Sequence, residues 1–253
     1  MGWINLSQMA IKGMLRRGRL LSYQLFVILF FFPIMILWFI SSYIATFADS
    51  SGNLAHRFLT FWARSSLALA GLRVHIEGHE RLDPEMTYVF MSNHASFLDI
   101  LLAFAYFPYN FRFIIKEEIF SIPFIGWVLR RSRQIPIDRQ NPRRGLKSLK
   151  QAADLLKEGI SLVVFPEGTR TPNGKLQGFK ETLFVLPIRA RISVVPVLIE
   201  GTFKALKRGS VLLNPVPLRL TFYDPIPPAS FKDRDRGVYA EKARLVLLTT
   251  IRN

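Results

Sequence analysis

The chain of 253 residues is long enough for one large domain or two small ones. It contains no cysteine, which excludes disulfide bonds, thiolate catalysis and cysteine-ligated metal sites. The formal charge is +16, and half of the residues are hydrophobic, 22 of them phenylalanine. Nucleic-acid binders are usually basic and polar, so a chain that is basic and apolar favours an anionic membrane surface over nucleic acid as its partner.

The first predicted element is an apolar helical segment. No charged residue occurs between Leu20 and Ala48, and a helix needs about 20 apolar residues to cross a bilayer. The apolar region of a signal peptide would be shorter, about 7–15 residues. Four basic residues precede the run and would keep that end in the cytoplasm, so a single crossing would place the rest of the chain outside. Pro33 favours another arrangement, two short helices that enter one leaflet and return.

Residues 54–71 predict a second, amphipathic helix. One face is basic and polar and the other is apolar and aromatic: Arg57, Thr60 and Arg64 against Phe58, Leu59, Trp62 and Leu69. A helix of this kind suits the bilayer interface, although it could instead pack on the core of a globular domain. We expect residues 1–71 to anchor the chain to a membrane and residues 72–253 to form a second, globular domain.

The remainder alternates short β-rich runs with helical ones. The candidate strands are LRVHIEG, TYVFMSN, FRFIIK, RQIPID, SLVVFPE, SVVPVLIEG and LRLTFYD. The clearest helix follows Pro142 and ends at Gly159, with an apolar stripe of Leu146, Leu149, Ala153 and Leu156. This alternation predicts an α/β fold with a mixed, largely parallel sheet flanked by helices. Functional sites in such folds lie in loops beyond the carboxyl ends of the strands.

Residues 93–99, NHASFLD, occupy such a loop. A turn between His94 and Asp99 would bring the carboxylate to the imidazole, where it could fix the ring tautomer and support a general base. An alternative is structural, because Ser96 and Asp99 have the spacing of a capping box that starts the next helix. Both roles can hold at once.

A second polar loop follows the predicted strand at residues 161–165. In the string VVFPEGTR, Gly168 would let the backbone approach a ligand closely, and the planar guanidinium of Arg170 could bind a phosphate.

Taken together, four motifs make the chain resemble the glycerolipid acyltransferases, and among them the 1-acyl-sn-glycerol-3-phosphate (lysophosphatidate) acyltransferases. In chain order they are His94 with Asp99, the stretch from Lys116 to Ile137-Asp138-Arg139, FPEGTR from Phe165 to Arg170, and Val195-Pro196-Val197. The resemblance covers roughly residues 70–225. This sequence departs from the family's pattern in two places. In the second motif, Arg133 and Pro136 stand where the family usually has Gly and Phe. After the third motif, Phe179-Lys180-Glu181-Thr182 lacks the glycine of the usual Phe-Lys-x-Gly. Both changes bear on the acceptor rather than on the chemistry.

The resemblance implies transfer of a fatty acyl group from acyl-CoA or acyl-carrier protein to the free hydroxyl of 1-acyl-sn-glycerol 3-phosphate. The product would be phosphatidic acid, made in phospholipid biosynthesis without a cofactor or a metal. His94 would act as the base, oriented by Asp99, and the hydroxyl would attack directly. A Ser96–His94 dyad is a less favoured alternative.

The resemblance also implies the substrate contacts. Arg139 and Arg170 would bind the acceptor phosphate, with Lys116 as a weaker candidate. Glu167 would hold an arginine or the glycerol hydroxyls, beside Gly168 and Thr169 of the same loop. The catalytic domain would face the cytoplasm at the inner membrane.

Three other functions are considered. The enzyme could acylate another lysolipid, such as a lyso-ornithine lipid or a different lysophospholipid, or glycerol 3-phosphate itself. The chain could instead be a non-catalytic, basic membrane-binding module. Metal-dependent hydrolysis is disfavoured, because one His-Asp pair supplies too few ligands for a zinc site.

Overall fold

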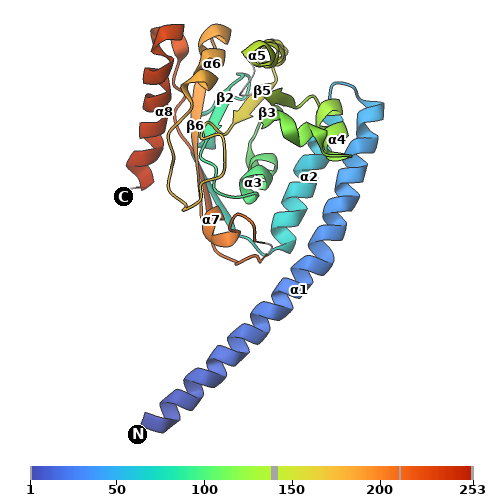
Figure 1. The fold of residues 1–253 in the computed structure, drawn as a ribbon, viewed down its shortest axis with the longest axis vertical. Coiled ribbons are helices and arrows are strands. Elements are labelled where there is room, and N and C mark those ends of the chain that lie inside the picture. The colour runs from blue at the N-terminus through green and yellow to red at the C-terminus, as the bar shows by residue number, and fades with distance from the viewer. Residues whose placement is uncertain (1, 138–141, 211, 252–253) are drawn as a thin grey trace.

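A mixed, mostly parallel sheet of seven strands forms the centre of the protein (Figure 1). The computed structural model describes residues 2–137, 142–210 and 212–251. The strands are β1 (Val74–Glu77), β2 (Val89–Ser92), β3 (Phe111–Lys116), β4 (Ile135–Ile137), β5 (Ser161–Val164), β6 (Val194–Glu200) and β7 (Leu218–Phe222). Each candidate strand segment contains one of them, so the predicted α/β sheet is confirmed.

The strand order places β2 in the middle of the sheet. The order is β1-β7-β6-β2-β5-β3-β4, and among the paired strands of the described chain only β6 and β7 run antiparallel. All four residues of β2 are buried. Because parallel strands end at the same edge of a sheet, the loops that follow β2, β3 and β5 lie near one another.

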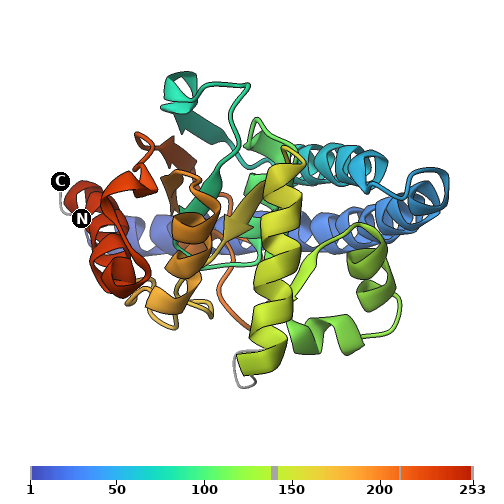
Figure 2. The same cartoon turned by 90° about the horizontal axis from the view of Figure 1, so that it is seen from above.

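Helices cover both faces of the sheet (Figures 1 and 2). They are α2 (Asn53–Leu69), α3 (Leu98–Tyr106), α4 (Ile125–Arg131), α5 (Pro142–Lys157), α6 (Val185–Ala190), α7 (Thr202–Ala205) and α8 (Arg236–Ile251). Alternate residues of β2 serve two separate cores. Phe90 packs with α2 and α3, whereas Val89 and Met91 pack with α5, α6 and α8.

The helix α5 follows its sequence pattern. It begins at Pro142, and Leu149, Ala153 and Leu156 contribute to the second core. Gly159 adopts a φ of +78° just after its end, as expected of a glycine that terminates a helix.

The first helix differs from its prediction. Helix α1 runs without a break from Gly2 to Ala48 and includes Pro33. The expectation of two short helices on either side of Pro33 is therefore wrong, since the chain turns back only after Ala48, into α2 (Figure 1). A proline removes one helix hydrogen bond and can leave the helix kinked rather than ended. Within the described residues, none of the helices combines the length and hydropathy needed to cross a bilayer.

Helix α2 packs on the core, as the alternative interpretation of residues 54–71 requires. Leu59, Trp62 and Leu67 are buried in the cluster shared with α3. Of its large aromatic side chains, Phe61 stays exposed, with its ring centroid 4.5 Å from that of Trp38 in α1. The apolar face assigned to the bilayer interface thus lies largely inside the protein, and the boundary at residue 71 remains a prediction.

Arg112 of β3 ties the turn between α1 and α2 to the sheet. Its side chain is fully buried. The guanidinium donates to the carbonyls of Phe111 and Ser51 and to the side-chain oxygens of Asn110 and Asn53, over 2.7–3.0 Å. Burial lowers the pKa of Arg112 to about 10, so it remains a cation at neutral pH.

Because His56 lies buried near Arg112, we predict that the free energy of unfolding depends on pH in the acid range. Burial, together with the charge of Arg112, lowers the pKa of His56 to about 3, whereas an unfolded histidine titrates near about 6.5. The unfolded chain therefore binds the extra proton below that pH, and stability should fall by about 1.4 kcal/mol per pH unit on acidification. The measurement is denaturant unfolding of wild type and His56→Gln between about pH 7 and about pH 4.

The glutamine cannot titrate in this range, so the acid slope of His56→Gln should be shallower than that of wild type by this amount. Equal slopes would contradict the assignment.

Candidate active site

His94 lies in the loop between β2 and α3, where the sequence placed it. Its Nδ1 is 2.8 Å from Oδ2 of Asp99. The aspartate is fully buried and the histidine side chain is 15% exposed. Because an ionised carboxylate only accepts, this contact assigns the proton to Nδ1 and leaves Nε2 as the basic nitrogen. Such an imidazole can take a proton from a group that reaches the open side of the loop.

Asp99 is held by the loop that it helps to form. The same Oδ2 accepts the backbone N–H groups of Ala95 at 2.6 Å and Ser96 at 2.8 Å. Oδ1 is buried and has no hydrogen-bond partner among the described residues. The orientation of the carboxylate toward His94 is thus set by backbone geometry.

Ser96 serves the loop rather than the chemistry. Its hydroxyl donates to the carbonyl of Leu206 at 2.7 Å and accepts the N–H of Leu98 at 3.3 Å. Half of the expected capping box is formed, since the Asp99 carboxylate accepts the Ser96 N–H, but the hydroxyl caps Leu98 instead of Asp99. The geometry therefore does not support a Ser96–His94 dyad.

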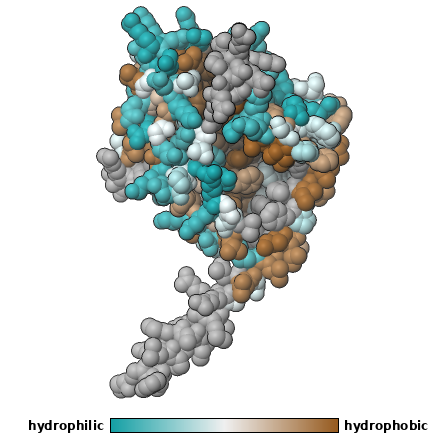
Figure 3. Space-filling view, viewed as in Figure 1, coloured by the Kyte–Doolittle hydropathy of each residue, from teal (hydrophilic) through white to brown (hydrophobic). Residues whose placement is uncertain are grey.

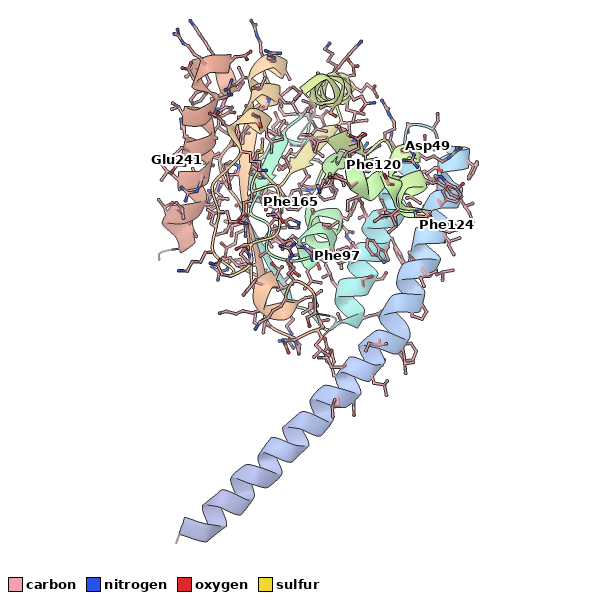
Figure 4. All side chains as sticks on the ribbon, in the orientation of Figure 1. Asp49, Phe97, Phe120, Phe124, Phe165 and Glu241 are labelled. Carbon is pink, nitrogen blue, oxygen red and sulfur yellow. The ribbon has the colours of Figure 1, made fainter. Side chains whose placement is uncertain are left out.

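The FPEGTR loop contacts both the ring and the backbone of His94, and Figure 4 shows its Phe165 in the middle of the molecule. The ring of Phe165 stacks on the imidazole, with centroids 4.0 Å apart and planes 13° apart. Glu167 Oε1 accepts the backbone N–H of His94 at 2.7 Å, and the carbonyl of His94 accepts the N–H of Thr171 at 2.8 Å. Both hydrogen-bonding groups of the His94 backbone are therefore held by this loop.

Glu167 bridges two loops with its two oxygens. Besides the contact to His94, Oε2 accepts the N–H of Gln177 at 3.0 Å. The residue is 5% exposed. Burial raises the pKa of Glu167, while the backbone hydrogen bonds from His94 and Gln177 oppose that rise. Within the described part of the chain no ion pair joins it to an arginine.

Residues 168–170 of this loop are less buried than Glu167. Gly168 has a φ of +80°, which a glycine adopts without strain, and its N–H closes a turn onto the carbonyl of Phe165. Thr169 is exposed and Arg170 is half-buried. The described residues offer Arg170 no hydrogen-bond or ion-pair partner, so its guanidinium is available to an anion.

Of the other predicted substrate contacts, Lys116 is described and is paired with another residue. Lys116 ends β3, and its ammonium is 2.7 Å from Glu118 on the exposed surface. Arg139 lies outside the described residues. The substrate roles of Lys116, Arg139 and Arg170 stay predictions.

Asn93 is a site residue that the sequence analysis missed. Its side-chain amide donates to the carbonyl of Ile199 and accepts the Ile199 N–H, both at 2.8 Å, so it pairs like a backbone with β6. This pairing fixes the start of the His94 loop. The position of an asparagine directly after a buried strand was the available signal, but its partner is 106 residues away in sequence.

Comparisons with known proteins identify the family of the chain. A family model described as Acyltransferase matches residues 73–200. A chloroplastic 1-acyl-sn-glycerol-3-phosphate acyltransferase of Arabidopsis thaliana is 38% identical over 174 residues, 68% of this chain and 48% of the relative. An enzyme of the same name from Pseudomonas aeruginosa is 34% identical over 54% of each chain. This chain thus spans about half the length of these two curated relatives.

The fold is shared with a solved structure. The crystal structure of the 1-acyl-sn-glycerophosphate acyltransferase from Thermotoga maritima superposes with a TM-score of 0.76 and 23% identity, covering 94% of this chain and 96% of that one. At this identity the likeness establishes the architecture alone. The match of residues 73–200, which contain the His94 loop, Glu167 and Arg170, shows that the chain belongs to the acyltransferase family.

Proposed function

We propose that the protein transfers a fatty acyl group from acyl-CoA or acyl-carrier protein to the free hydroxyl of 1-acyl-sn-glycerol 3-phosphate. The observation that carries the proposal is the buried Asp99 carboxylate at Nδ1 of a partly exposed His94, which leaves Nε2 basic. Family membership and the names of the relatives support the reaction class. The product is phosphatidic acid, an intermediate of phospholipid synthesis.

In the proposed step, Nε2 of His94 takes the proton of the acceptor hydroxyl as its oxygen attacks the thioester carbonyl. The new C–O bond forms, the C–S bond breaks, and the proton passes from Nε2 to the leaving sulfur. Asp99 stabilises the positive charge that the imidazole carries between these two transfers. The Phe165 ring on one face of the imidazole restricts how the ring can turn.

The acceptor phosphate is assigned to Arg170, with Arg139 as its partner. Arg170 is half-buried in the loop that holds His94, and its guanidinium can bind a phosphate through two parallel hydrogen bonds. The acceptor resides in a membrane and the thioester donors are soluble. We therefore place the protein at the cytoplasmic side of an inner membrane, attached through the exposed apolar residues of α1.

The function is tested by acyl transfer from labelled acyl-CoA, and in parallel from acyl-carrier protein, with wild type and His94→Ala. The acceptors are 1-acyl-sn-glycerol 3-phosphate, other lysophospholipids, a lyso-ornithine lipid and glycerol 3-phosphate. We expect product from wild type with 1-acyl-sn-glycerol 3-phosphate and none above background from the variant. Product with another acceptor alone would replace the substrate and keep the chemistry, and no product at all would support the membrane-binding module.

Replacing Asp99 with Asn separates charge from shape. The amide oxygen can still accept the N–H groups of Ala95 and Ser96, but the negative charge beside the imidazole is lost. We expect kcat to fall by roughly 10²–10⁴-fold, the usual contribution of acid–base catalysis, while the unfolding midpoint changes little. If the rate loss follows a loss of stability instead, Asp99 acts only in starting α3.

Glu167→Gln and Arg170→Ala should differ in which kinetic constant changes. A carboxylate offers one oxygen to His94 and one to Gln177, whereas glutamine has a single acceptor, so the base should be misplaced and kcat should fall by roughly 10–100-fold. Arg170→Ala removes a charged phosphate contact and should raise the acceptor KM by roughly 10–100-fold.

Glu85→Gln, at an exposed position before the start of β2 and so at the other end of that strand from His94, is the matched control. It should change neither constant. An unchanged kcat in Glu167→Gln, combined with a raised acceptor KM, would instead place Glu167 on the substrate.

A further inference from the structure

Phe124 holds an unusual backbone conformation in the loop between η2 (Glu117–Ser121) and α4. Its φ is +61° and its ψ is −52°, and the N–H of Ile125 donates to the carbonyl of Pro123 at 2.7 Å. These values describe a γ-turn with positive φ at its central residue, a rare and strained turn. A bulky side chain disfavours this region, so the conformation persists only because the surroundings impose it.

The surrounding loop is packed tightly enough to impose it. Gly126 is buried, and a Cβ at this position would come within 1.9 Å of the carbonyl oxygen of Phe120. The same carbonyl accepts a hydrogen bond from Arg130 at 2.7 Å, and the N–H of Gly126 donates to Ile122 at 2.8 Å. Close packing and hydrogen bonds therefore fix the conformation of this loop.

This well-packed loop exposes apolar side chains to solvent. Phe124 is 67% exposed, and the exposed neighbours are Ile119, Ile122, Ile125 and Trp127. Figure 4 shows Phe124 on the outer side of the molecule, beside α1, and away from Phe120 and Phe165. Burial of apolar side chains lowers the free energy of a protein in water. Here one of them, Phe124, is exposed by a turn whose backbone conformation itself costs free energy.

The loop continues the apolar surface of α1. The rings of Tyr43 and Trp127 have centroids 6.4 Å apart, and the guanidinium of Arg131 lies 4.0 Å from the centroid of Phe47. On α1 the exposed residues around this contact are Ile40, Ile44 and Phe47. Hydrophobic residues gather on the side of the molecule where α1 and α4 lie (Figure 3).

The charges beside this surface are of both signs: three residues are basic (Lys116, Arg130 and Arg131) and two are acidic (Glu117 and Glu118). Arg130 and Arg131 are exposed at the end of α4, and the acidic Glu118 is paired with Lys116. The chain as a whole carries +16. Exposed phenylalanine and tryptophan rings beside arginines match the interface of an anionic bilayer, where apolar rings enter the acyl region and cations meet the headgroups.

We propose that the segment of residues 119–127 inserts Phe124 and Trp127 into an anionic bilayer, as a second contact beside α1. This segment includes the end of η2, the turn at Phe124 and the start of α4. The inference rests on the proposed function only in that the acceptor is a membrane lipid. The loop begins directly after the carboxyl end of β3, the sheet edge that also carries the His94 loop. Insertion here brings that edge to the bilayer, so a lysolipid can reach Nε2 without leaving the membrane.

The absence of cysteine allows a direct test. Single cysteines replace Phe124 on the loop, Ile44 on α1 and Val238 on α8, each exposed, and carry an environment-sensitive fluorophore. The labelled proteins are mixed with phosphatidylcholine–phosphatidylglycerol vesicles that contain nitroxide-labelled acyl chains. We expect a blue shift and quenching at positions 124 and 44 and neither at position 238. Quenching at position 44 without quenching at position 124 would overturn the proposal. A blue shift at position 124 that appears without vesicles, when the protein dimerises, would overturn it as well.

Phe124→Gly provides the matched binding measurement. Glycine adopts positive φ without strain, so the unfolding midpoint should not fall, while vesicle binding should weaken about ten-fold through loss of one inserted phenylalanine. Unchanged vesicle binding would overturn the proposal. Because binding is measured without substrates, its failure is separate from failure of acyl transfer, which is assayed with detergent-dispersed acceptor.

Discussion

The site depends on one buried oxygen, Oδ2 of Asp99, which accepts three N–H groups at once. Two come from the backbone of Ala95 and Ser96 and the third from the His94 ring. A buried carboxylate is stable only when it is hydrogen-bonded, so the turn and the charge require each other. The direction of the imidazole, and with it the position of the basic nitrogen, follows from this one acceptor.

The loop from Phe165 to Thr171 completes that arrangement by holding the backbone of the same histidine. Glu167 and Thr171 bind its N–H and carbonyl, and Phe165 covers one face of its ring. Two motifs that are far apart in the chain therefore form one unit around His94. In this arrangement both oxygens of Glu167 are used by backbone N–H groups, whereas the described residues leave the guanidinium of Arg170 without a partner.

Local pattern was enough for much of this architecture. Short β-rich runs identified all seven strands, and Pro142 with Gly159 marked the ends of α5. The partners of Glu167 and Ser96 could not be predicted, because they are 73 and 110 residues away and depend on strand order. Helix α1 passes Pro33 because one missing hydrogen bond does not end a helix that has neighbours to pack on. The positive φ of Phe124 could not be predicted either, because the sequence has neither glycine nor asparagine at that position.

The buried guanidinium of Arg112 has a mechanical consequence. It grips the turn that joins α1 to α2 at Ser51 and Asn53, and it belongs to β3, whose far end leads into the loop of Phe124. Helix α1 is therefore tied to the start of β3 at this turn, in addition to its direct contacts with α4 through Tyr43 and Phe47. Because α1 is held at two places, we expect it to move together with the sheet that carries His94 rather than to hinge at the turn after Ala48.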